Sequence, residues 1–197
     1  MTMKQCLAMV ACCAMLTLPV SVLAQGQKPK MAAEGVPVAP ADSLNALLHL
    51  MESQVVGAAD AMPADKYDFV PSVTGGEFKD VRSFGSQVRH LAQANYEFFR
   101  GWGIPGEVDP KTLESLKTKD ELMKALRDSY KFAHAAVDSI TPQNAFLSVK
   151  APEAFKATRT SMAAFAMAHS MDHYGQMVEY LRMNGIVPPA SRPGASM

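Results

Sequence analysis

Four stretches of the chain carry apolar residues every three or four positions, which is the spacing of one buried face of an α-helix. They run from about residue 42 to 62, from 81 to 102, from 118 to 140 and from 152 to 184. No stretch shows the alternation of apolar and polar residues that is typical of a half-buried strand. We therefore predict an all-α fold, and four amphipathic helices of this length predict a four-helix bundle.

The residues at the ends of these stretches support the boundaries. Asp42 is the expected N-cap of the first helix, which we expect to stop before Pro63. Thr118 and Glu121 have the spacing of a capping box at the start of the third helix. Gly185 is well placed to end the fourth helix, because glycine adopts the left-handed conformation found there.

Segments rich in proline and glycine separate the helices and flank them. Residues 63–80 contain two prolines and a Gly-Gly pair, so we expect a long loop between the first two helices. Residues 25–40 are poor in large apolar groups, and we interpret them as a flexible lead. We expect the bundle to cover residues 41–187 and a loose tail to cover residues 188–197.

The first residues of the chain have the pattern of a secretory signal peptide, which we assign to residues 1–24. Lys4 precedes an uncharged apolar run that contains Pro19 and ends in small residues. Val22 and Ala24 match the −3 and −1 positions of a cleavage site, so we expect export to the periplasm or the exterior. An uncleaved membrane anchor is the alternative, because a run of this length could span a bilayer.

Cleavage at this site would remove all three cysteines, Cys6, Cys12 and Cys13. We therefore expect the mature protein to lack disulfides, cysteine nucleophiles and thiolate metal ligands. The whole chain carries 19 basic and 19 acidic residues, and this balance gives no support for nucleic acid as a partner. We also expect no stable membrane insertion after cleavage.

The histidines are the main candidates for chemistry. His169 and His173 are four residues apart, so they lie on one face of the fourth helix, one turn apart. Neutral imidazoles are good ligands for transition metals, but such a pair also occurs by chance in helices. We interpret the isolated His49 and His134 as ordinary hydrogen-bonded core or surface residues.

A metal site needs at least one more donor from another helix. His90, on the second predicted helix, is the best candidate for a third ligand. Gln176 follows His173 by three residues, so it lies on the same face and could orient an imidazole or a bound water. Glu97 and Asp172 are candidates for a general base, although exposed carboxylates with no such role are common.

Several motifs together resemble the DinB-like (DinB/YfiT) metal-binding four-helix bundles, over about residues 41–189. The motifs are "MPADKYDFVPS" after the first helix, "FGSQVRHLAQANYEFF" on the second, "TKDELMKALRDSYKF" on the third and "AHSMDHYGQMVEYLRMNGIVPP" on the fourth. The last motif is the most specific. By this resemblance, the metal-binding histidines of the family correspond to His90, His169 and His173.

The resemblance implies one divalent transition metal ion per chain, with zinc or nickel as the leading choices. It implies a metal-dependent hydrolase or transferase that acts on an unidentified small-molecule substrate. The alternative is a non-catalytic metal-binding or stress-associated bundle, and a homodimer is one open state of assembly. Thiol-dependent members of the family would use a cytoplasmic low-molecular-weight thiol, which an exported protein would not readily meet.

We predict that the exported protein begins at Gln25, because the small residues before it form the cleavage site. Mass spectrometry of the exported material should detect this N-terminus and should find no peptide that contains Cys6, Cys12 or Cys13. An intact N-terminal segment would instead indicate a membrane anchor, and the cysteines would then remain in the mature chain.

Overall fold

The computed structural model describes residues 32–151 and 156–195. The predicted signal peptide, the first part of the flexible lead (25–31) and the expected start of the fourth helix lie outside these residues. Residues from Pro37 onward form one compact unit that contains every helix described below.

Four long helices dominate this unit, as the periodicity predicts. Between Ser148 and Thr158 there is an isolated β-bridge, and the described residues contain no strand. The all-α prediction is therefore confirmed. The long helices are α1 (Pro40–Ala61), α2 (Phe84–Phe98), α3 (Lys119–Asp138) and α4 (Arg159–Met183), and the short 3-10 helices are η1 (Ala64–Lys66), η2 (Pro110–Ser115) and η3 (Pro189–Ser191).

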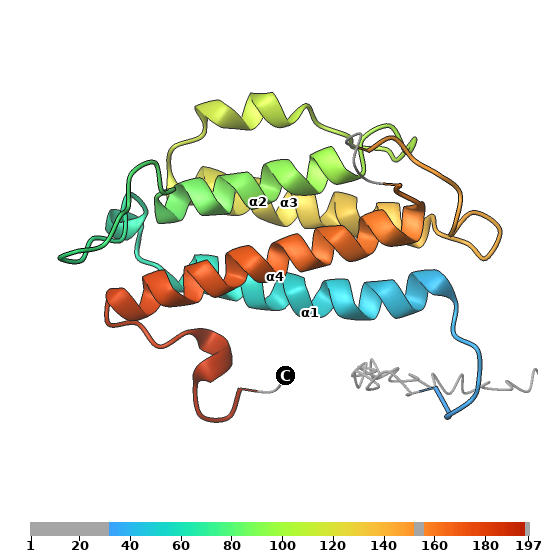
Figure 1. Ribbon diagram of the computed structural model, residues 1–197, viewed down its shortest axis with the longest axis horizontal. Coiled ribbons are helices and arrows are strands. Elements are labelled where there is room, and N and C mark those ends of the chain that lie inside the picture. The colour runs from blue at the N-terminus through green and yellow to red at the C-terminus, as the bar shows by residue number, and fades with distance from the viewer. Residues whose placement is uncertain (1–31, 152–155, 196–197) are drawn as a thin grey trace, which may run out of the picture. The chain divides into compact units, whose positions relative to one another are not determined.

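The long helices lie side by side, and the main contacts join α1 to α3 and α4, and α2 to α3 and α4 (Figure 1). Residues 99–118, which include η2, return along α2, so α2 and α3 run in the same direction (Figure 1). Of the helices that are consecutive in the chain, α2 and α3 are neighbours, whereas α1 and α2, and likewise α3 and α4, are opposite each other in the bundle. This topology creates an α2–α4 interface and an α1–α3 interface, and both of them carry histidines.

Two of the predicted helix ends are confirmed in detail. The side chain of Thr118 accepts a hydrogen bond from the backbone N–H of Glu121, and the Glu121 carboxylate accepts from the backbone N–H of Thr118. At the end of α4, Gly185 has a φ of +73°. Its N–H donates to the carbonyl of Arg182, and the N–H of Ile186 donates to that of Leu181, which is a Schellman motif.

The start of α1 differs from the prediction. The helix begins at Pro40, and Asp42 lies in its first turn and not at the N-cap. Proline is favoured at this position, because its fixed φ suits a helix and its missing N–H would have had no partner within the helix. Asp42 still suits its place, since a negative charge is favourable near the positive end of the helix dipole.

The starts of α2 and α4 also differ from the prediction, because hydroxyl side chains cap these helices later in the chain than the apolar pattern suggests. Ser83 caps α2, so the helix starts at Phe84 and not at 81, and it ends at Phe98, before the expected 102. Thr158 caps α4 and pairs with Ser161, so the described part of this helix starts at Arg159 and not near 152.

The bundle core holds apolar side chains from all four long helices, and the polar groups inside it are largely paired. Asn95 on α2 donates a hydrogen bond to Ser129 on α3 at 3.1 Å. The hydroxyl of the fully buried Tyr130 on α3 lies 3.4 Å from that of Ser170 on α4. These bonds connect helices that are far apart in the sequence, so they help to set the register of the bundle.

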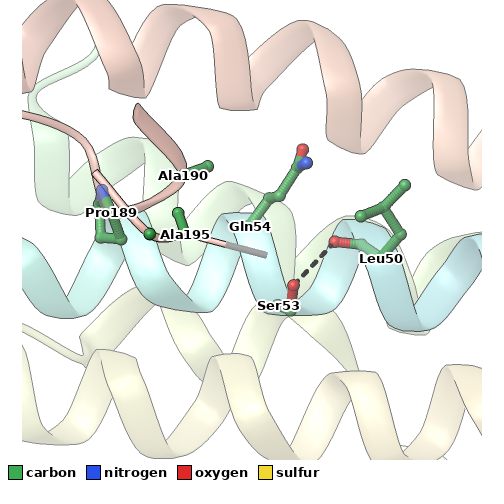
Figure 2. A pocket seen from close by; sticks show the side chains of 7 residues that line it. Leu50, Ser53, Gln54, Pro189, Ala190 and Ala195 are labelled. Atoms are coloured by element: carbon green, nitrogen blue, oxygen red, sulfur yellow. Dashed lines mark hydrogen bonds between the residues drawn. The ribbon is translucent and has the colours of Figure 1, made fainter. Parts of the chain in front are cut away.

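The C-terminal tail, which we expected to be loose, includes η3, and η3 contacts α1. Arg192 donates to the carbonyl of Val187 at 3.1 Å, and this bond closes the turn. Figure 2 shows Pro189, Ala190 and Ala195 beside α1, where they line a cavity of about 330 Å³ with Leu50, Ser53 and Gln54.

None of the helices in residues 32–151 and 156–195 is long and apolar enough to cross a membrane.

Candidate metal centre

The α2–α4 interface brings the three predicted metal ligands together. His90 lies on α2, and His169 and His173 lie one turn apart on α4. The Nε2 atoms of His90 and His169 are 3.1 Å apart. The centroids of the three rings are 4.5 to 5.0 Å apart, and one ring nitrogen from each lies within 4.8 Å of the others. This group of imidazoles could hold a metal ion.

The separation of the nitrogens suits a shared ion. Zinc holds imidazole nitrogens at about 2.0 to 2.1 Å, so two nitrogens on one ion are roughly 3 Å apart. A hydrogen bond between a neutral donor ring and a neutral acceptor ring also accounts for the 3.1 Å contact of His90 with His169. That bond would leave the adjacent His173 without a role, whereas a shared ion uses all three rings.

The environment favours the neutral, metal-binding form of each imidazole. Burial lowers the pKa of His90 to about 4, and the positive charge of Arg82 acts in the same direction. Burial also lowers the pKa of His173 to about 4, with a further contribution from His169. The pKa of His169 is lowered by burial as well. Neutral rings keep a lone pair on nitrogen, which a metal ligand requires.

Two buried polar atoms in this region have no hydrogen-bond partner among the described residues, and they are Nδ1 of His173 and Oε1 of Gln87. Leaving such an atom unpaired costs about 1 to 3 kcal/mol. A ring nitrogen of the buried His173 is therefore available for a ligand. Three neutral imidazoles, one of them with an unpaired nitrogen, fit a divalent transition metal ion.

Gln176, which we predicted to lie beside the ligands, connects α4 to α2. Its Oε1 accepts a hydrogen bond from Nε2 of Gln87 at 2.7 Å, and its Nε2 donates to Asp172 at 3.0 Å. These two bonds hold the Gln176 amide in place next to the histidine face of α4. Its action on a metal ligand stays a prediction.

A pocket of about 360 Å³ opens beside the histidines, and His90 and His169 form part of its wall. The other wall residues are mostly apolar, and they include Ala94, Phe98, Pro110 and Phe165. The ring of Phe98 packs edge-on against both Phe165 and His169, with centroids 5.2 Å apart in each case. An apolar group of a small molecule can therefore bind within reach of the imidazoles.

The structure distinguishes the two candidate bases. Glu97 lines the same pocket as His90 and His169, and it also pairs with Arg100 at 3.5 Å. Asp172 is exposed on α4 and accepts the hydrogen bond from Gln176. Glu97 is thus the carboxylate that a molecule in the pocket would meet.

Sequence analysis missed several residues around the site. Gln87 lies one turn before His90, and Phe165 lies one turn before His169, so helical spacing could have indicated both. Pro110 has no such signal, because it reaches the pocket through the long connection between α2 and α3.

The structure also gathers His49, Glu52 and His134 at the α1–α3 interface. We interpreted both histidines as ordinary residues, and His134 is indeed half-buried and hydrogen-bonded. The clustering of these two histidines with a carboxylate was not predicted, because it joins residues from two different helices.

The fold and the site define a class of protein. It is a four-helix bundle in which helices α2 and α4 bring three imidazoles together beside a pocket. Residues 47–177 match the family model of the DinB superfamily. The match covers well over half of the chain, and the chain therefore belongs to the DinB superfamily, as the motifs predict. No curated protein matches the sequence.

We predict that the metal-free protein loses stability as the pH falls from about 6.5 to about 4. The pKa of His90 and of His173 is about 4 in the folded protein and near 6.5 in the unfolded chain. Between these values the unfolded chain binds more protons, so acid favours unfolding. Urea denaturation at several pH values, with a chelator present, should show this decline.

A double variant with His90→Gln and His173→Gln should show a shallower decline over the same pH range. Equal slopes for the variant and the wild type would contradict the effect of burial on these two imidazoles.

Proposed function

We propose that His90, His169 and His173 bind one divalent transition metal ion, with zinc or nickel as the preferred metal. We further propose that the protein is a metal-dependent hydrolase or transferase whose small-molecule substrate binds in the adjoining pocket. The observation that carries the proposal is that three neutral imidazoles converge beside an apolar pocket, and two of them form part of its wall.

In this proposal the histidines and Glu97 have different roles. The three imidazole nitrogens would hold the ion, and three protein ligands would leave positions open for water or substrate. When bound, the ion would supply a Lewis acid that polarises a substrate oxygen and lowers the pKa of a water. Glu97 is the pocket carboxylate, and we assign it the acceptance of a proton from the attacking group.

The pocket walls would orient the substrate. Phe98, Phe165 and Pro110 offer apolar surface, so they favour a substrate with an aliphatic or aromatic portion and exclude water around it. Gln93 also lines the pocket, and its Nε2 donates to the carbonyl of Pro110 at 3.0 Å. This bond holds the connection after α2 against the helix and so maintains the wall.

The export that we infer from residues 1–24 bears on the reaction. A thiol-dependent transfer would need a low-molecular-weight thiol, which is plentiful in the cytoplasm but not outside it. Hydrolysis needs only water. Export of the mature protein therefore favours a hydrolase over a thiol-dependent transferase.

We predict that single changes of His90, His169 or His173 to Ala weaken zinc binding at this site by about 100-fold or more, because each change removes a direct ligand. Calorimetric titration with zinc, nickel and copper would measure the affinity. His49→Ala and His134→Ala are the matched histidine controls, and neither should alter the tight site. If His90→Ala binds like wild type while His134→Ala does not, the third ligand lies on a different helix.

We predict that the zinc- or nickel-loaded protein turns over at least one member of a panel of ester, thioester and amide substrates with apolar groups. His169→Ala should abolish this turnover, and Glu97→Gln should lower kcat by about 100-fold while metal binding is retained. Tight metal binding without turnover across the panel would instead indicate the non-catalytic binding protein.

A further inference from the structure

A second group of potential ligands lies at the α1–α3 interface, on a different pair of helices from the triad. His49 and Glu52 come from successive turns of α1, and His134 comes from α3. Nε2 of His134 lies 3.1 Å from Oε2 of Glu52, and Nδ1 of His49 lies 3.7 Å from the same oxygen. One ligand atom from each residue lies within 4.8 Å of the others.

A chain of hydrogen bonds fixes which nitrogen of His134 faces Glu52. The Nδ2 group of Asn45 donates to the carboxylate of Asp138, which can only accept. The Oδ1 atom of Asn45 must then face His134, and it accepts from Nδ1 at 2.7 Å. Nδ1 therefore carries a proton, and Nε2 is directed at the Glu52 carboxylate.

This arrangement resembles the support that metal-ligating histidines receive in proteins. Such a histidine donates its other ring N–H to an oxygen acceptor, which orients the ring and makes the ligating nitrogen more basic. Here the Asn45 amide is that acceptor, and Asp138 orients the amide in turn. Nε2 of His134 is therefore the nitrogen that can bind a cation next to the Glu52 carboxylate.

The second imidazole makes a simple ion pair an incomplete explanation. The rings of His49 and His134 stack with centroids 4.0 Å apart and planes inclined by 28°. Both imidazoles direct a nitrogen at Oε2 of Glu52, at 3.1 Å from His134 and 3.7 Å from His49, and an ion pair with one histidine accounts for only one of these contacts. A single cation shared by two imidazoles and a carboxylate accounts for all three positions.

We propose that His49, Glu52 and His134 form a second binding site for a divalent transition metal ion, positioned by Asn45. Two histidines with one glutamate form an established ligand set for zinc. The side chain of His49 is 69% exposed, against 30% for Glu52 and 16% for His134. Binding must therefore order an exposed side chain, so this site is weaker than the triad and exchanges its ion with solvent more readily.

The test uses the full chain with His90→Ala and His169→Ala, which removes the triad. Calorimetric titration of this variant with zinc at pH 7.5 should find one zinc ion per chain. Adding Glu52→Gln or His134→Gln should weaken binding by about 100-fold, and adding Asn45→Ala should weaken it by about 10-fold, because Asn45 only positions a ligand. Glu114→Gln removes an exposed carboxylate elsewhere, and it should change nothing.

A second measurement uses the otherwise wild-type chain, so it does not depend on the folding of any variant. NMR signals of the His49 and His134 rings should shift only after the first equivalent of zinc, as the weaker site fills. The proposal fails if these signals stay in place in excess zinc, or if Glu52→Gln binds zinc as Glu114→Gln does. The calorimetric result does not depend on the triad, which is absent from that variant. If the triad of the wild-type chain binds no zinc, the His49 and His134 signals should shift from the first zinc added, so a failure of the triad and a failure of this site are distinguishable.

Discussion

The packing of α2 against α4 is the contact on which the candidate site depends, because it buries imidazoles from both helices in one place. Burial disfavours the charged form of each ring, so the rings are neutral and their nitrogens remain available. The neighbouring bond between Gln87 and Gln176 joins the same two helices and holds them in register. The arrangement that suits metal binding therefore follows from helix packing, and no loop is needed to supply a ligand.

Apolar periodicity was enough to predict the helices, because each helix buries one face and the apolar residues of that face recur every three or four positions in the sequence. Capping was predictable where the signal was a pair of residues, as at Thr118 with Glu121. It failed at Asp42, because the proline before it begins the helix earlier. The starts at Ser83 and Thr158 were also missed, because these N-caps lie inside a longer apolar pattern.

The candidate site was predictable only in part, for a reason that lies in the topology. His169 and His173 share one helix, so their spacing alone places them together. His90 is on α2, and the motif resemblance identified it, whereas His134 is on α3 and no local signal connects it with His49. The position of Pro110 in the pocket wall could not be predicted either. Residues 99–118 lack the periodic apolar pattern of a long helix, so nothing in the sequence indicates that they pack along α2.

That return also explains why the bundle has two histidine clusters and not one. It makes α2 and α3 run in the same direction, so α2 lies beside α4 and α1 lies beside α3 (Figure 1). Each of these interfaces joins helices that are not consecutive in the chain, and each collects side chains from sequence positions about 80 residues apart. The clusters differ in burial: the triad contains the buried His173, whereas His49 is mostly exposed. The same topology thus places one cluster beside a pocket, with a buried histidine, and the other at the surface of the bundle.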